Sequence, residues 1–235
     1  ELEEKFKISK MTIWRDLKML DVKGLVKKVH GGAVKREIAL PPEPSFDEKK
    51  LIASKEKEII ARYAAENFIN DGNIVSLGAG STILKMMPYL IKKNITLLTI
   101  GLQNILYALK FAPQLNIIAS GGSLRHPALA YVGPIAEEFF RKYKTDLVFL
   151  SGTGLTIKDG IMDPHPLDVE IKKIMTQNAK KVVFLMDSSK INQISLATSI
   201  NLEDIDILIT DDGAPDDFRK EVKKLNIDVR YIAYQ

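Results

Sequence analysis

Two patterns of apolar residues alternate along the second part of the chain. From Asn73 onward, short runs rich in β-branched residues are each followed by a stretch with apolar residues at helical spacing. Runs that are apolar throughout are typical of strands buried on both faces of a sheet. The predicted strands are Ile74–Leu77, Ile95–Ile100, Leu115–Ala119, Leu147–Leu150, Val182–Met186, Ile205–Thr210 and Val229–Ile232.

The stretches between these strands predict helices. Alternating strands and helices favour an α/β domain with a mostly parallel, doubly wound, Rossmann-like sheet. In such a sheet, ligands bind beyond the carboxyl ends of the strands. The predicted helices are one long helix over Glu48–Phe68 and shorter ones at Ile83–Ile91, Gln103–Phe111, Ile135–Tyr143, Leu167–Asn178 and Asp216–Lys224.

The first part of the chain predicts a small helical module. Ser9 is a good N-cap, and Ile13, Leu17 and Leu20 follow at i, i+4 and i+7, a stripe that faces a small core. A helix with this buried seam can lie in the major groove of DNA, where Arg15 can donate two hydrogen bonds to a guanine edge. Its other face presents Thr12, Trp14, Arg15 and Lys18, and Lys10 or Lys18 can donate to phosphates.

A short hairpin is predicted after this helix. Residues Leu25 to Val29 alternate like a strand, a His-Gly-Gly turn follows at residues 30–32, and Ala33 to Lys35 form a second strand. Such a hairpin is a wing that follows the phosphate backbone. The residues expected at this contact are Lys27, Lys28, Lys35 and Arg36, and His30 of the turn is a further DNA-binding candidate.

The charge of the chain is concentrated in this module. Residues 1–40 contain ten Lys and Arg against six Asp and Glu, whereas residues 41–235 contain 24 of each. A local basic excess is typical of a module that binds a polyanion. The alternative is a structural cap whose basic face is merely solvated.

Three prolines at positions 41, 42 and 44 mark a domain boundary, because neither a helix nor a central strand can cross them. We therefore predict a winged helix-turn-helix over residues 1–40, a linker over 41–50 and an effector-binding α/β domain over 51–235. The chain has no cysteine, which excludes disulfides, and its three histidines are far apart in the sequence, which argues against a metal site. Neither a membrane-spanning run nor a signal-peptide pattern is present, so we expect a cytoplasmic protein.

Glycine-rich turns follow three of the predicted strands, at residues 78–82, 121–123 and 151–154. Glycines let backbone amides approach an anion, and Ser81 and Thr82 add hydroxyl donors, so a phosphate is the expected ligand. The first turn is neither a P-loop nor a GxGxxG fingerprint, so we expect no ATP or NAD. Arg125, Lys172 and Lys190 are the candidate cationic partners, although each taken alone could be an ordinary surface residue.

The segments Ser9–Leu17 and Gly24–Ala33 closely resemble the N-terminal signature of the DeoR family of bacterial sugar-metabolism regulators. Residues 50–235 resemble the effector domain of that family, whose fold is similar to ribose-5-phosphate isomerase. The resemblance implies a repressor that binds operator DNA and a phosphorylated sugar. Symmetric operators and helix-turn-helix geometry also favour a homo-oligomer, dimer or larger. The effector positions expected are Gly78, Ala79, Gly80, Ser81, Thr82, Gly101, Gly121, Gly122, Arg125, Gly152, Asp168, Lys172 and Lys190.

The chain departs from the family pattern at several positions. Trp14 replaces a usual arginine, which is expected to change operator preference. Gly78 replaces an aspartate, Ile100 an asparagine and Asp168 a glutamate, which favours a different effector or weaker effector binding. The chain also begins without the first helix of such modules, which suggests truncation. Candidate replacements for the missing polar groups are His126, Tyr131 and His165.

Two other functions remain open at this point. A sugar-phosphate isomerase needs a carboxylate base beside the substrate and an electrophile. The acidic motifs of the isomerases are not found, because Asp159-Gly160-Ile161 lacks the second acid. An assembly protein that kept the fold and lost the effector is the third class.

Overall fold

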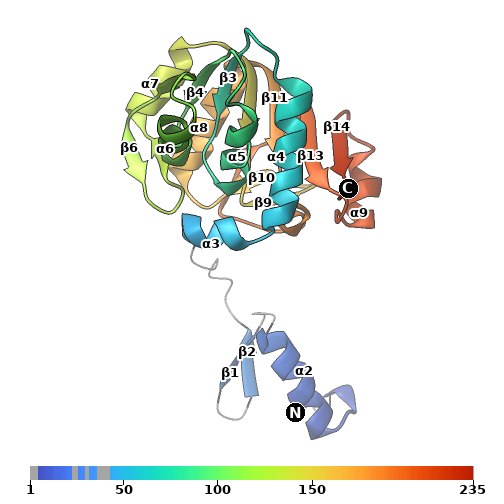
Figure 1. The fold of residues 1–235 in the computed structure, drawn as a ribbon. Helices are drawn as coiled ribbons and strands as arrows, with labels where there is room; N and C mark the ends of the chain where they lie inside the picture. Colours follow the sequence, from blue (N-terminus) through green and yellow to red (C-terminus); the bar gives the residue numbers. More distant parts are fainter. Residues whose placement is uncertain (1–4, 23–25, 30–31, 36–42, 235) are drawn as a thin grey trace. The chain divides into compact units, whose positions relative to one another are not determined.

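The computed structural model of the chain describes residues 5–22, 26–29, 32–35 and 43–234 (Figure 1). Contacts divide the chain into two compact units, residues 1–42 and 43–235, which we describe separately. None of the helices in the described ranges combines the length and the apolar character that crossing a bilayer demands.

The first unit contains helix α2 (Lys10–Val22) and a hairpin of β1 (Val26–Val29) and β2 (Gly32–Lys35). The Oγ of Ser9 accepts a hydrogen bond of 3.3 Å from the amide of Thr12, so the N-cap is present as predicted. The two strands are antiparallel, with Val26 opposite Lys35. Helix α2 packs against β1. Lys5 and Phe6 are helical as well.

The second unit is built on a parallel sheet of seven strands, and each of the seven predicted strands is one of them. The order is β14-β13-β11-β8-β3-β4-β5, and every neighbouring pair is parallel. The α/β fold class is thereby confirmed. The strands are β3 (Ile74–Leu77), β4 (Thr96–Thr99), β5 (Asn116–Ala119), β8 (Thr145–Leu150), β11 (Ala179–Leu185), β13 (Ile207–Asp211) and β14 (Asp228–Ile232).

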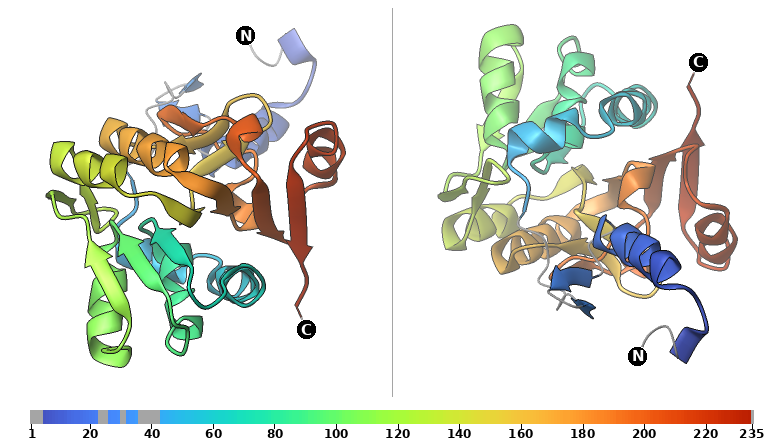
Figure 2. Two further views of the ribbon diagram at one scale, coloured as in Figure 1. Left: turned by 90° about the horizontal axis from the view of Figure 1, so that it is seen from above. Right: turned by 90° about the horizontal axis from the view of Figure 1, so that it is seen from below.

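Helices cover both faces of this sheet (Figure 2). In β8, Val148 and Leu150 belong to one apolar core while Leu147 and Phe149 belong to the other, because side chains alternate along a strand. Helices α4 (Ser54–Phe68), α5 (Ser81–Leu84) and α6 (Leu102–Phe111), with the 3-10 turn η1 (Met87–Tyr89), share the core of Phe149. Helices α7 (Pro134–Lys142), α8 (Pro166–Gln177) and α9 (Asp216–Val222) share the core of Val148.

Short antiparallel strands and turns lie beyond the main sheet, and the apolar pattern did not predict them. Strand β6 ends at Arg125 and strand β10 ends at Asp163, so these small elements deliver charged side chains. The elements are β6 (Ser123–Arg125) with β7 (Ala130–Val132), β9 (Gly154–Thr156) with β10 (Gly160–Asp163) and β12 (Ala197–Ile200), and the 3-10 turns η2 (Ser188–Lys190) and η3 (Leu202–Asp204).

The prediction of one helix over Glu48–Phe68 was wrong. Helix α3 (Phe46–Leu51) ends before Ala53, whose φ of 49° is left-handed, and α4 starts afresh at Ser54. Helix α3 also occupies much of the expected linker, 41–50, because Ser45 starts it with a capping box. The Oγ of Ser45 accepts from the Glu48 amide at 3.3 Å, and the Ser45 amide donates to the Glu48 carboxylate at 2.7 Å.

Replacing Ser45 with alanine should therefore lower the free energy of unfolding of the second unit by about 1 kcal/mol, because the Glu48 amide loses its acceptor and the Glu48 carboxylate loses a hydroxyl donor. Denaturant unfolding followed by circular dichroism measures this loss. Ser45→Asn, which keeps an acceptor at the cap, is the matched control and should recover most of it. Equal stability of the alanine variant and the unmodified protein would contradict the role of the cap.

Candidate anion pocket and nucleic-acid interface

The main pocket lies where the strand order reverses. From β3 the chain moves outward through β4 to β5, and it then returns to place β8 on the other side of β3. The loops after β3 and β8 therefore leave the sheet in opposite directions and open a crevice between them. Residues 79–82 and 151–153 line the pocket, and they come directly from these two loops.

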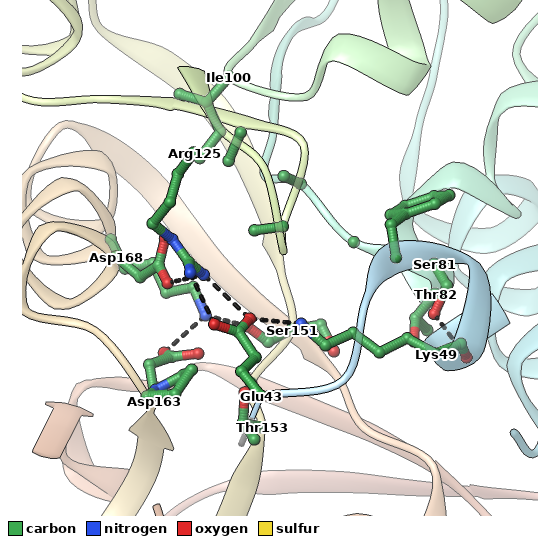
Figure 3. Close-up of a pocket in the computed structure, with 18 of the residues that line it drawn as sticks. Glu43, Lys49, Ser81, Thr82, Ile100, Arg125, Ser151, Thr153, Asp163 and Asp168 are labelled. Atoms are coloured by element: carbon green, nitrogen blue, oxygen red, sulfur yellow. Dashed lines mark hydrogen bonds and ion pairs between the residues drawn. The ribbon is translucent and has the colours of Figure 1, made fainter. Parts of the chain in front are cut away.

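Charged side chains from distant segments meet in this pocket (Figure 3). They come from the start of the second unit, helices α3, α4 and α8, the ends of β6 and β10, and the turn η2. The lining residues are Glu43, Phe46, Lys49, Lys57, Ala79, Gly80, Ser81, Thr82, Ile100, Arg125, Ala128, Ala130, Ser151, Gly152, Thr153, Asp163, Pro164, Asp168, Ile171, Lys172 and Lys190.

Arg125 lies between two carboxylates. Its Nη1 and Nη2 donate to the two oxygens of Glu43 at 2.6 and 3.0 Å. Its Nε donates to Asp168 at 3.0 Å, and its Nη2 pairs with the other Asp168 oxygen. Burial would lower the pKa of Arg125, but the hydrogen bonds and charges of Glu43 and Asp168 outweigh it and raise the pKa. The guanidinium is thus held as a charged centre of the pocket.

Glu43 also pairs with Lys49 of helix α3. Burial alone would raise the pKa of Glu43, yet hydrogen bonds from Arg125 and Lys49 and the charges of both cations lower it below its ordinary value. Glu43 is therefore an ionised carboxylate in a site that is lined by cations.

A second buried ion pair lies deeper in the pocket. The Nζ of Lys172 donates to Asp163 at 2.6 Å and to the carbonyl of Ser151 at 2.5 Å. Lys172 follows Asp168 by one turn of α8, so this helix points a carboxylate and an ammonium group in the same direction. Burial raises the pKa of Asp163, and the charge of Lys172 only partly opposes that rise.

Two more lysines line the pocket. Lys57 of α4 donates to the carbonyls of Lys49 and Ile52 at 2.6 and 2.7 Å, and burial lowers its pKa to about 8. Lys190 of η2 makes no ion pair with another described residue, so its ammonium group remains available to a ligand.

The glycine-rich turns divide into those that line the pocket and those that do not. Gly80 has a φ of 115°, and a side chain at Gly152 would lie 2.4 Å from Ile161, so only glycine fits at these lining positions. Gly122 instead makes room for the β6-β7 hairpin, because a Cβ there would lie 2.8 Å from the Val132 carbonyl. Four predicted effector positions are outside the pocket lining: Gly78, Gly101, Gly121 and Gly122.

The three candidate replacements for polar groups do not line the pocket either. The Nδ1 of His165 accepts from the Leu167 amide at 3.2 Å and caps helix α8. Tyr131 packs partly buried against an apolar core. The backbone carbonyl of His126 accepts a hydrogen bond from the amide of Leu129 in a turn. Ile100, the departure noted in the sequence, does line the pocket with an apolar side chain.

The first unit presents the expected helix surface. Ile13 and Leu17 are half-buried, whereas Lys10, Trp14 and Lys18 are exposed. Thr12 departs from the prediction, because it was expected on the exposed face and is half-buried. The Arg15 side chain is 74% exposed, with its Nε 3.8 Å from the Asp16 carboxylate. Lys27 and Lys28 lie in β1. His30 and Arg36 lie outside the described residues.

Both units match known families. Residues 1–38 match the DeoR-like helix-turn-helix domain, and residues 52–212 match the DeoR C terminal sensor domain. The chain belongs to the DeoR family. The resemblance inferred from its two sequence segments is confirmed, and with it a regulator built from a helix-turn-helix and a sensor domain.

Curated relatives of this DeoR-family chain carry regulator names. The HTH-type transcriptional regulator GlpR of Haloferax volcanii is 33% identical over 94% of this chain and 86% of its own length. IolR of Bacillus subtilis, named an HTH-type transcriptional regulator, is 32% identical over 93% of this chain and 86% of its own. The transcriptional repressor AccR of Agrobacterium fabrum is 29% identical over 90% and 82%.

Solved structures show partial likenesses. Ribose 5-phosphate isomerase A of Methanocaldococcus jannaschii has a TM-score of 0.44 and 16% identity over 59% of this chain and 55% of that one. The eIF2B delta subunit of Chaetomium thermophilum has a TM-score of 0.43 and 20% identity over 62% and 50%. The chain thus spans about half the length of these proteins.

Sequence reasoning missed four of the charged pocket residues of this DeoR-family sensor unit, namely Glu43, Lys49, Lys57 and Asp163. Glu43 and Lys49 lie in the expected linker, and no local pattern connects Glu43 with Arg125, 82 residues away. Asp163 had a weak signal that could have been used, because a carboxylate directly after the apolar residues Ile161 and Met162 stands at the end of a strand.

Replacing Lys172 with methionine should lower the free energy of unfolding by about 3 kcal/mol, because it leaves the Asp163 carboxylate buried without its cation. Denaturant unfolding measures the change. Lys173→Met removes the same charge from the exposed neighbouring position and should cost less than about 0.5 kcal/mol. Adding Asp163→Leu to Lys172→Met should restore part of the loss, and an equal loss in the Lys172 and Lys173 variants would argue against a stabilising pair.

Proposed function

We propose that this DeoR-family protein is a repressor of sugar-metabolism genes that binds operator DNA and is controlled by a phosphorylated sugar. The observation that carries the effector part is the group of cations that converges at the reversal point of the sheet. The DNA part is supported by the exposed basic face of helix α2 and by the family match of residues 1–38.

The charge of the pocket favours an anionic ligand. Its lining contains five cationic side chains and three carboxylates, which leaves a formal excess of two positive charges. A sugar phosphate carries a comparable negative charge. The lining cations are Lys49, Lys57, Arg125, Lys172 and Lys190, and the carboxylates are Glu43, Asp163 and Asp168.

The rest of the lining supplies small and polar groups for a sugar. Gly80 leaves backbone open to a close approach, because nothing lies within 4 Å of the position that its Cβ would take, and Ser81, Thr82 and Thr153 add hydroxyls. Ile100 adds an apolar wall where the family usually has asparagine. We therefore propose an effector that makes fewer polar contacts at that wall than the sugars of other family members.

For the DNA-binding unit we propose the roles that its sequence suggested. Arg15 would read a base edge in the major groove, while Lys10, Lys18, Lys27 and Lys28 would contact phosphates, with Thr12, Trp14 and His30 beside them. Paired half-sites in operators favour a homo-oligomer, which light scattering of the purified protein would test. Cytoplasmic residence stays a prediction.

Arg15→Ala should remove the preference for operator over unrelated DNA, because a bidentate base contact contributes about 1–3 kcal/mol of discrimination. Lys28→Ala should instead weaken binding to both DNAs alike and reduce the salt slope by about 1. Fluorescence anisotropy with a promoter fragment and a scrambled fragment, at several salt concentrations, separates the two effects. Identical behaviour of the two variants would refute this division of roles.

A sugar phosphate that binds the pocket should raise the melting temperature of the protein, and the unphosphorylated sugar should not. Saturation at 100 times the dissociation constant stabilises the folded state by about 2.7 kcal/mol. Thermal shift across a panel of sugar phosphates, each paired with its free sugar, measures this. If none stabilises the protein at millimolar concentration, the effector proposal fails.

An isomerase activity is the second candidate function, and the environment of Asp163 is the observation that favours it. Its carboxylate is buried in the pocket with a raised pKa, which is the condition of many general bases. Against catalysis, each of the three pocket carboxylates is paired with a cation. Turnover of ribose 5-phosphate that disappears in Asp163→Asn would favour the enzyme.

A further inference from the structure

We propose that Glu43 is an internal occupant of an anion site formed by Arg125 and Lys49, and that the anionic group of the effector binds there by displacing it. This inference rests on the proposed control by a phosphorylated ligand. It gives two pocket residues opposite roles: Lys49 is a cation that receives the ligand, and Glu43 is a carboxylate that competes with it.

The contacts of Glu43 are those of a bound anion. Its two oxygens face the two terminal nitrogens of Arg125 at 2.6 and 3.0 Å, and one of them also meets the ammonium group of Lys49 (Figure 3). Proteins also bind phosphate in this geometry, with two of its oxygens on the two terminal nitrogens of a guanidinium and a lysine beside them. A phosphate can therefore take over the same three donors.

Both cations keep a partner when Glu43 leaves. Arg125 retains two contacts with Asp168, through Nε at 3.0 Å and through Nη2. Lys49 retains a hydrogen bond of 3.3 Å to the carbonyl of Pro127. A buried charge without any partner would be strongly unfavourable, and neither cation is left in that state. Another anion can thus replace Glu43 while the remaining contacts of Arg125 and Lys49 stay in place.

Electrostatics favour the exchange when a multivalent anion is present. With Glu43 in place the lining has a formal excess of two positive charges, and without it the excess is three. Glu43 contributes a single negative charge, whereas a phosphate monoester carries up to two. Because Glu43 is ionised at neutral pH, it competes as a charged group and lowers the apparent affinity of every other anion.

The position of Glu43 in the chain lets this exchange reach the other unit. Residues 43–45 have no regular secondary structure, and the nearest anchor is the cap of α3 at Ser45. Glu43 can therefore leave Arg125 without unwinding a helix or a strand. It is also the first residue of the second unit, directly after the segment that connects it to the DNA-binding unit. When the ligand displaces Glu43, Arg125 no longer holds the end of that segment that is attached to the sensor unit.

Calorimetric titration with inorganic phosphate tests the competition directly. Glu43→Gln removes the charge but keeps the shape, and we expect it to bind phosphate at least tenfold more tightly than the unmodified protein. Asp47→Asn is the matched control, because it removes one negative charge four residues away at an exposed position and should leave the affinity unchanged. Adding Arg125→Gln to Glu43→Gln should abolish the gain. Glu43→Asp, which keeps the charge on a shorter side chain, should lie between the two.

The possible failures are distinguishable. If phosphate or a sugar phosphate binds the unmodified protein and Glu43→Gln with equal affinity, Glu43 does not compete, and only this inference is overturned. A gain of the same size in Asp47→Asn would overturn it as well, since net charge would then explain the effect. If neither phosphate nor any sugar phosphate binds any of the variants, the proposed effector class falls together with the inference.

DNA binding gives an independent measure of the coupling. The affinity of Glu43→Gln for a DNA fragment that the protein binds should shift in the same direction as the affinity of the unmodified protein with saturating sugar phosphate. The variant should also respond less to that ligand. A variant that binds DNA like the ligand-free protein and responds to the ligand in full would contradict the coupling.

Discussion

The second unit depends on one constraint: the buried guanidinium of Arg125 must be matched by negative charge. An arginine that is 11% exposed is costly to bury alone, and two carboxylates from distant segments of the unit surround it. Glu43 comes from the start of the unit, and Asp168 comes from helix α8. The charge of Arg125 thus ties the entry of the chain, the β6-β7 hairpin and α8 to one point beside the reversal of the sheet.

The two carboxylates are unequal partners. Asp168 is fixed by the first turns of a twelve-residue helix, so its contact with Arg125 belongs to the folded frame. Glu43 precedes the six-residue helix α3 and lies in a segment without regular structure. The same cation therefore has one permanent partner and one that a stronger anion can replace. Because of this difference, the ion pair between Glu43 and Arg125 is the one that breaks when an anion occupies the pocket of this DeoR-family protein.

Much of this arrangement could be predicted from the sequence, and the reason for each failure is physical. The seven strands of the main sheet were found because an apolar run can be recognised from neighbouring residues alone, and the pocket loops at residues 79–82 and 151–153 followed from their glycines. The break at Ala53 was missed because its left-handed backbone has no residue signature. The pair of Glu43 with Arg125 was missed because it joins residues 82 positions apart. Gly122 lies in a turn whose sequence is typical of a phosphate-binding loop. Close packing of the β6-β7 hairpin explains the glycine at this position equally well.

A crystal structure of the protein with a bound sugar phosphate tests the central claim most directly. We predict density for the phosphate on the guanidinium of Arg125 and the ammonium group of Lys49, with the Glu43 carboxylate moved away from both and Asp168 still paired with Arg125. A phosphate bound elsewhere in the pocket, with Glu43 still on the fork of Arg125, would contradict the account.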